Sequence, residues 1–156
     1  MPSEDPFHTL PSDLMVGAQL GPPSVEPTEG KRMTDIKPGA IVHAELASND
    51  IAATRRFLEK VFAWKFKKEE MGPDMEYWTF NPGSGPAGGL MPAMEGRPPS
   101  TVNYMLVESV DAAVKKITSN GGTILVPKQE IPKVGWCAIF EIPGGVMAAV
   151  FQPKMP

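Results

Sequence analysis

The sequence has little of what several large classes of protein require. One cysteine, Cys137, among 156 residues excludes an internal disulfide and is typical of a reducing compartment. No apolar run approaches the ~18 residues of a membrane-spanning helix. A formal net charge of -3 gives no basic surface for nucleic acid. These absences predict a cytoplasmic protein whose partners include neither membrane nor nucleic acid.

Large apolar residues are also scarce at the start of the chain. Residues 1–38 contain seven of the 18 prolines and no sustained apolar period, so they cannot bury enough surface to offset the entropy of ordering them. Glu4 and Asp5 stand where a secretory signal needs basic residues. We predict a disordered, proline-rich extension over 1–38. A short docking segment at 14–20 and translation from Met33 both remain open.

From residue 39 to 156 the chain is rich in apolar residues and repeats itself. A constant, gap-free shift of 60 positions places Leu46 on Leu106 and Phe80 on Phe140. A repeat of this length indicates a duplicated supersecondary unit, and two such units commonly build one site between them. The predicted folded domain, 39–156, divides into a first module at 40–91, a linker at 92–100 and a second module at 101–153.

Each module shows the same order of predicted elements. Apolar alternation and turn residues predict strands at 41–47, 64–69, 76–80 and 88–91, and again at 102–107, 123–126, 136–141 and 146–152. One helix per module follows the first strand; the first ends at Phe62, and Gly121-Gly122 ends the second. The predicted fold is α+β, with two tandem β-α-β-β-β modules forming a cup-shaped curled sheet and the helices outside.

This order and several segments resemble the vicinal-oxygen-chelate superfamily, which includes glyoxalase I, extradiol dioxygenases, and bleomycin- and fosfomycin-resistance proteins. The segments are 56–64, 110–114 with 120–122, and 131–135 with 143–146 and 151–153. The resemblance covers roughly residues 40 to 153 and implies a small glyoxalase-like member, commonly a homodimer. Because the superfamily supports many chemistries on one scaffold, the reaction stays open.

In the metal-dependent members, each module supplies one ligand from its first strand and one from its last. By the resemblance, these positions are His43, Asn103, Gly89 or Leu90, and Ala149. Glycine and alanine offer no side-chain donor, whereas a catalytic metal usually has about three protein ligands. We therefore expect no cofactor. The alternative is a divalent metal ion in an unconventional site made by His43, Glu45 and Asn103.

His43 and Glu45 form the second feature of chemical interest. They stand two residues apart in one predicted strand, so both side chains project from the same face. If that face lines the cup, the pair can act in acid–base catalysis or bind a polar group of a ligand. The alternative is structural: a satisfied core histidine, and a glutamate at a dimer interface or paired with a lysine.

The other candidates for the concave face are mostly apolar. Methionine adapts to irregular ligands and indole gives a flat stacking surface, although both are core-forming residues first. The predicted ligand-binding set is Trp78, Leu90, Asn103, Met105, Trp136, Met147 and Phe151.

Three functions follow as hypotheses. The first is a metal-independent protein that binds a small hydrophobic or aromatic molecule in the cup, as resistance proteins sequester toxic compounds. The second is an enzyme, a lyase, isomerase or dioxygenase that uses His43 and Glu45 as acid and base or as part of a metal site. The third is a structural or regulatory module whose cup is filled by its own side chains.

Overall fold

The computed structural model describes residues 32–155. The expectations for residues 1–31, including disorder and a docking segment at 14–20, lie outside the described residues. The described end of the predicted extension contains a short 3-10 helix, η1, at Met33–Asp35. Within 32–155, no helix is long and apolar enough to cross a membrane.

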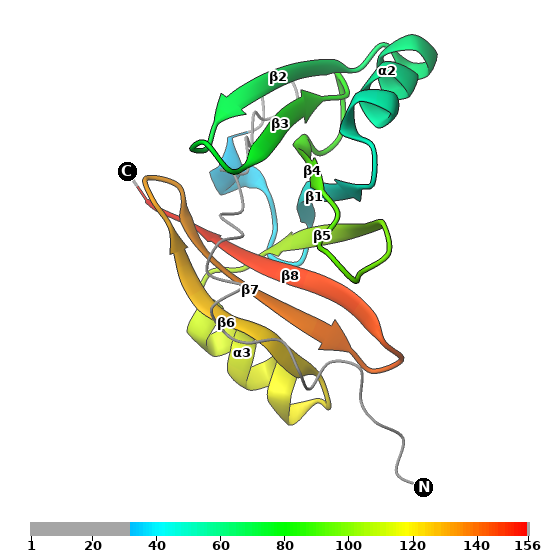
Figure 1. The fold of residues 1–156 in the computed structure, drawn as a ribbon. Helices are drawn as coiled ribbons and strands as arrows, with labels where there is room; N and C mark the ends of the chain where they lie inside the picture. The colour runs from blue at the N-terminus through cyan, green and yellow to red at the C-terminus, as the bar shows by residue number, and fades with distance from the viewer. Residues whose placement is uncertain (1–31, 156) are drawn as a thin grey trace, which may run out of the picture.

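Eight strands form one sheet that curls without closing (Figure 1). The first module contributes β1 (Ile41–Ser48), β2 (Lys65–Glu70), β3 (Glu76–Asn81) and β4 (Gly88–Pro92). The second contributes β5 (Ser100–Leu106), β6 (Thr123–Ile131), β7 (Gly135–Ile142) and β8 (Val146–Pro153). Their order is β2-β3-β4-β1-β5-β8-β7-β6, so the modules meet where β1 and β5 pair antiparallel. The predicted α+β fold of two tandem modules is confirmed.

Each module has one capped helix on the outer side of the sheet (Figure 1). In α2 (Ile51–Phe62), the Asp50 carboxylate accepts a 2.9 Å hydrogen bond from the backbone N–H of Ala53. In α3 (Val110–Ser119), the Ser109 hydroxyl accepts one from Ala112 at 3.1 Å. Such caps satisfy helix-end donors and typically contribute about 1 kcal/mol each. Because both helices lie on the outer side, the concave face of the sheet is formed by the strands.

One strand is longer than the sequence predicts. The prediction ended at residue 126, but β6 continues through Pro127 to Ile131. Proline has no backbone N–H to donate, so it is tolerated only at sheet edges or irregularities. β6 is the edge strand, and its pairing with β7 shifts register on both sides of Val126. The edge position explains how the strand continues past the proline.

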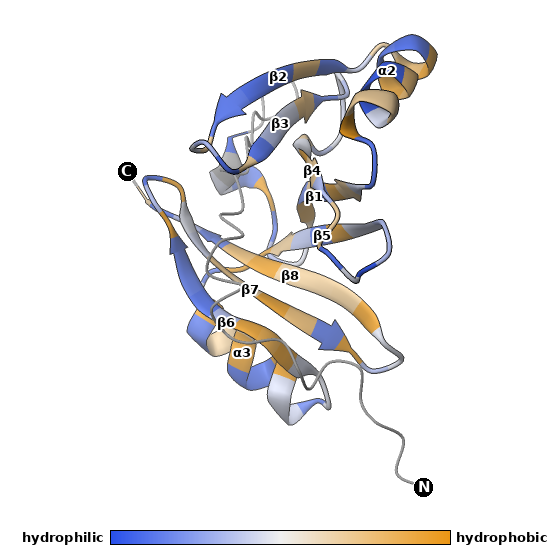
Figure 2. Cartoon of the chain, in the orientation of Figure 1, coloured by the Kyte–Doolittle hydropathy of each residue, from blue (hydrophilic) through white to orange (hydrophobic). Residues whose placement is uncertain are grey.

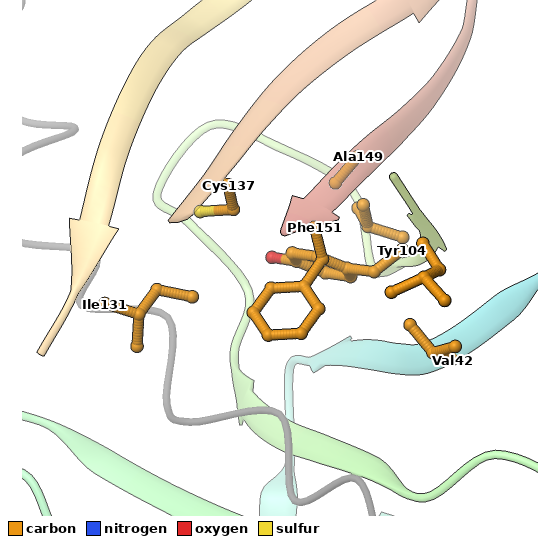
Figure 3. Close-up of a cluster of buried hydrophobic side chains, with 8 residues drawn as sticks. Val42, Tyr104, Ile131, Cys137, Ala149 and Phe151 are labelled. Carbon is orange, nitrogen blue, oxygen red and sulfur yellow. The ribbon is translucent and has the colours of Figure 1, made fainter. Parts of the chain in front are cut away.

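Two apolar clusters lie on opposite faces of the sheet, mostly within its second module. The outer cluster packs under α3 and contains Val110, Ala138, Phe140, Ala148 and Val150. The concave cluster contains Val42, Val102, Tyr104, Leu106, Ile131, Cys137, Ala149 and Phe151. Figure 3 shows Tyr104 and Phe151 between Val42 and Ile131, with Cys137 and Ala149 beside them. Successive residues of β8 thus alternate between the two faces, as strand geometry requires.

The repeat is not constant along the chain. In the third and fourth strands the offset is 60, because Thr79 lies opposite Gly89 and Ile139 lies opposite Ala149. In the first strands the offset is 59, because Glu45 lies opposite Gly89 whereas Tyr104 lies opposite Ala149. The gap-free shift of 60 was therefore wrong by one residue for the first strands. The structural counterpart of Glu45 is Tyr104.

Candidate functional site

Four side chains form a polar cluster where the two modules meet: His43, Glu45, Tyr77 and Tyr104. The imidazole Nε2 of His43 lies 2.8 Å from Glu45 Oε2, and the two side chains are only 1% and 4% exposed. The Tyr77 hydroxyl donates a 3.2 Å hydrogen bond to the same carboxylate oxygen. The ring of Tyr104 stands edge-on to the imidazole, with centroids 5.1 Å apart.

Three strands place this cluster. β1 carries both His43 and Glu45, and it is an interior strand with β4 on one side and β5 on the other. The alternation of a strand turns both side chains to one face, as the sequence predicted. β3 and β5 supply Tyr77 and Tyr104. The cluster therefore joins side chains from both modules, while its hydrogen-bonded part comes from the first.

Gly89 makes room for Tyr77. A Cβ atom added at Gly89 would lie 1.8 Å from the Tyr77 hydroxyl oxygen, so no other residue fits there without displacing the phenol. In the second module the corresponding positions, 60 residues on, hold Cys137 and Ala149. The smaller thiol leaves space for a methyl group. The first module thus places a phenol hydroxyl next to Glu45 where a fourth-strand side chain would otherwise lie.

Burial and the charge of Glu45 keep the two tyrosine hydroxyls and the nearby Cys137 thiol protonated. Burial, followed by the charge of Glu45, raises the pKa of both Tyr77 and Tyr104 well above the usual value. Burial also raises the pKa of the Cys137 thiol to about 11, against the opposing effect of a hydrogen bond from Gln129. At neutral pH the two phenols remain hydrogen-bond donors, and Cys137 is a poor nucleophile.

Three polar atoms of the cluster are buried without a hydrogen-bond partner: His43 Nδ1, Glu45 Oε1 and the Tyr104 hydroxyl. In the part of the chain that the structure describes, the one other such side-chain atom is Nε of Arg55, on α2. An unpaired buried polar atom costs about 1–3 kcal/mol, and folded proteins contain few. Their concentration in one cluster makes it the candidate functional site of the described residues.

An apolar groove borders the concave cluster. It has a volume of about 760 Å³ and is lined by Thr34, Ile36, Pro38, Leu106, Val107, Glu108, Gln152, Pro153, Lys154 and Met155. Leu106 belongs to the concave cluster, and Ile36 packs against it. The polar cluster itself is not part of the lining, so the groove reaches the apolar side of the cup only.

The donor set does not fit the metal site of the metal-dependent members. Within residues 32–155, no group of three or more His, Cys, Asp or Glu side chains is placed to hold an ion. Asn103, the third ligand of the alternative metal site, is exposed because it lies opposite Ala44 and faces away from His43. Gly89 and Ala149 offer no donor. We therefore derive no chemistry through a metal ion.

The structure divides the predicted ligand-binding residues between the two faces. Phe151 is a buried member of the concave cluster, and Met147 packs against it. Met105 and Trp136 instead pack with the outer cluster under α3. Met105 and Trp136 were predicted on the concave face, and that prediction was wrong by one strand position. Their role in binding stays a prediction.

Trp78 and Leu90 also lie on the outer face, on the side of α2. The guanidinium of Arg55, a residue of α2, stands 4.3 Å from the Trp78 ring centroid, and Leu90 is the fully buried cross-strand neighbour of Trp78. Sequence reasoning chose Trp78 over its neighbour Tyr77, which faces the cup. A glycine pair within a strand, Gly88-Gly89, was the available signal for a closely approaching group.

Tyr104 was missed for a different reason. The shift of 60 placed Asn103 beside His43, whereas the true offset of the first strands places Tyr104 there. The helix caps held the corrective signal, since Asp50 and Ser109 stand 59 positions apart. A cap is tied to the first turn of its helix and so fixes the register locally.

A family model confirms the resemblance on which these positions rest. The model of the glyoxalase/bleomycin resistance protein/dioxygenase superfamily matches residues 40–150. The chain belongs to this superfamily. The glyoxalase superfamily assignment covers both modules and every residue of the polar cluster.

Curated relatives agree with the family at moderate similarity. The chain is 28% identical over 116 residues to CFP32 of Mycobacterium bovis and of Mycobacterium tuberculosis, whose name gives glyoxylase activity as an assignment still to be proved. The match covers 74% of this chain and 44% of theirs, so the chain spans less than half the length of these relatives.

Solved structures share the fold of the glyoxalase superfamily. Methylmalonyl-CoA epimerase from Mycobacterium tuberculosis superposes with a TM-score of 0.58 at 17% identity, over 75% of this chain and 89% of that one. A hypothetical protein from Bacillus halodurans C-125 gives a TM-score of 0.60 at 14% identity, over 77% and 98%. At these identities the similarity shows the fold alone.

Proposed function

We propose that this glyoxalase-superfamily protein binds a small, largely apolar molecule on the concave face without the help of a metal ion. The observation that carries the proposal is the set of three buried, unpaired polar atoms on His43, Glu45 and Tyr104. A ligand that pairs with them removes the free-energy cost of burying them. Its apolar part packs against Phe151 and Met147 of the concave cluster.

Two features support binding without a metal. The His43 nitrogen nearest Glu45 is engaged with that carboxylate, and Tyr77 donates to the same oxygen. The phenol fills the space in which a fourth-strand ligand would stand. The cluster is thus organised by hydrogen bonds among its own members, as a polar anchor for a ligand requires.

The test follows the imidazole of His43 directly. The chain has two histidines, His8 and His43, so a His8→Ala variant leaves a single set of imidazole nitrogen signals in NMR. Titration with a library of uncharged aromatic fragments is expected to shift the Nδ1 signal and to raise the unfolding temperature. Binding that leaves this signal unchanged, or that survives His43→Ala at full strength, contradicts the proposal.

Elemental analysis of the purified protein tests the metal-independent part. We expect far less than one equivalent of nickel, zinc, iron or manganese, both as purified and after incubation with excess ions. A near-stoichiometric ion that is lost in both His43→Ala and Glu45→Ala would show that the two side chains are ligands instead.

A second candidate function is proton transfer on the bound molecule. The 2.8 Å contact between His43 and Glu45 favours it, because a carboxylate that orients an imidazole is a common arrangement for a general base. The measurement is deuterium incorporation from D2O into ligands identified by the fragment titration. Exchange that is lost in Glu45→Gln while binding persists would establish an enzyme; binding without exchange leaves sequestration.

We also propose that the chain forms a homodimer through α2. Phe57, Val61 and Phe62 of this helix are each more than half exposed, at 60%, 54% and 57%. A contiguous exposed apolar patch commonly marks an interaction surface. Light scattering coupled to size-exclusion chromatography tests the dimer, with Phe57→Ser as the disrupting variant.

A further inference from the structure

We propose that the polar cluster selects ligands whose polar group is uncharged or cationic, and that Glu45 is the residue that excludes carboxylates and phosphates. The inference rests on the proposed function, because it names the class of molecule that the same site binds. It is drawn from the charges and the unpaired atoms of the cluster.

The charge of the central pair is never positive while Glu45 is ionised. His43 and Glu45 are in contact at 2.8 Å and almost completely buried. The pair carries no net charge when the imidazole is protonated and one negative charge when it is not. An anionic ligand group would therefore enter a site that cannot offset its charge, and an uncompensated buried charge is strongly unfavourable.

The charges that act on the two phenols have the same sign. After burial, which is the largest cause, Glu45 and Glu69 raise the pKa of Tyr77, and Glu45 raises that of Tyr104. Lys67 lies near Glu69, at 3.4 Å, but its side chain is 78% exposed at the edge strand β2. The lysine offsets Glu69 at the rim of the cup and leaves the field of Glu45 in place at the centre.

Two of the three unpaired atoms, Glu45 Oε1 and the Tyr104 hydroxyl, lead to the same selection. Glu45 Oε1 is an acceptor and can bind only a donor, while the Tyr104 hydroxyl donates and also accepts. A carboxamide, hydroxyl or amidine brings an N–H or O–H group to Glu45 Oε1. A carboxylate brings acceptors alone, so its lone pairs would face those of Glu45.

Three probes of one shape test the selection: naphthalene-2-carboxamide, naphthalene-2-carboxamidine and naphthalene-2-carboxylate. At pH 7.5 their polar groups are uncharged, cationic and anionic. Calorimetric titration of the full chain is expected to give Kd values for the amide and the amidine that are at least roughly tenfold lower than for the carboxylate. This comparison uses the unmodified protein, so it does not depend on the folding of any variant.

The variant Glu45→Gln then assigns the selection to one residue. Glutamine keeps the shape and an acceptor, but it removes the negative charge and adds an N–H donor from which a carboxylate can accept a hydrogen bond. We expect the preference for the amide over the carboxylate to fall by about tenfold or more. The matched control is Glu130→Gln on β6. It removes the carboxylate of the solvent-exposed ion pair between Glu130 and Lys154 and should leave the preference unchanged.

The titrations distinguish the selection, the role of Glu45 and small-molecule binding itself. A carboxylate that binds as tightly as the amide overturns the selection while leaving small-molecule binding intact. A preference that survives Glu45→Gln in folded protein, or that changes equally in Glu130→Gln, overturns the role of Glu45. If none of the three probes binds and the fragment titration is also negative, the proposed function fails and this inference fails with it.

Discussion

The two modules share a backbone but contribute different chemistry to the cup. The first module supplies the hydrogen-bonded groups His43, Glu45 and Tyr77, whereas the second supplies a wall that includes Cys137 and Phe151. In Figure 2, β8 of the second module is hydrophobic along most of its length, whereas β2 of the first module is hydrophilic. The repeated backbone fixes where side chains point, and each copy determines separately what stands there.

Their helices differ in the same way. Val110 of α3 is fully buried, and Ala113, Val114 and Ile117 pack against the outer cluster of the sheet. In α2, Ile51 is buried but three large apolar residues near the C-terminal end are mostly exposed. Most of the packed core therefore belongs to the second module. The first module combines the buried polar cluster with an exposed apolar patch on α2.

Truncating Phe151 should produce the largest effect, because it removes the centre of the packed module. Phe151→Ala is expected to lower the free energy of unfolding by about 3–5 kcal/mol, the usual cost of deleting a buried aromatic ring. Urea denaturation followed by circular dichroism measures it. Val146→Ala, at a 61% exposed position of the same strand, is the control and should cost under about 0.5 kcal/mol. Similar losses for both would contradict the assigned core.

The next largest loss of stability is expected from Gly89→Ala, which gives the first module the residue that the second module has at the corresponding position. Gly89→Ala forces a Cβ against Tyr77 and is expected to cost roughly 2–3 kcal/mol. In a Tyr77→Cys background, which copies the pair of the second module, the same change should cost close to nothing. A double-mutant cycle by urea denaturation measures this coupling. An equal penalty in both backgrounds would show that the phenol is not what Gly89 accommodates.

The two tyrosines should differ although both are buried phenols. Tyr77→Phe removes a donor to a carboxylate and should lower the free energy of unfolding by about 1–2 kcal/mol. Tyr104→Phe removes an unpaired hydroxyl, so stability should change by less than about 0.5 kcal/mol or increase. Ligand affinity in the fragment titration should fall in Tyr104→Phe. A large loss of stability there would mean that the hydroxyl has a partner within the fold.

The exposed face of α2 should show the smallest effect on the folded monomer. Phe57→Ser is expected to change the free energy of unfolding by about 0.5 kcal/mol or less at low protein concentration. Val114→Ser in α3 is the counterpart and should cost more, because Val114 packs against the outer cluster. Thermal unfolding at several protein concentrations measures both. A concentration-independent loss in Phe57→Ser would show that this face packs within one chain.

The sequence predicted the fold well because its signals are local. The apolar alternation of the strands, the one helix after the first strand of each module and the turn glycines each depend on neighbouring residues, and this order recurs in both modules. The strand through Pro127 was underestimated, because an edge position cannot be recognised before the sheet order is known.

The site was predicted in part, for a reason of register. His43 and Glu45 lie on one strand, so their shared face followed from alternation alone. Tyr77 and Tyr104 come from other strands, and a shift of one residue turns a side chain to the opposite face. The pairing of β1 with β5 is irregular between Ile41 and His43, which no repeat reveals. The structure was therefore needed to show which residues of different strands face one another.

The position of β1 in the middle of the sheet also has a consequence for synthesis. Its pairing with β4 is possible once residue 92 has left the ribosome, but its other edge waits for β5, which begins at Ser100 and lies beyond the connecting segment. During that interval the nascent first module presents an unpaired edge of β1, the strand that carries His43 and Glu45. Unpaired strand edges are where chains aggregate, and charged residues on such a strand oppose pairing, so we expect His43 and Glu45 to limit the aggregation of the incomplete chain as well.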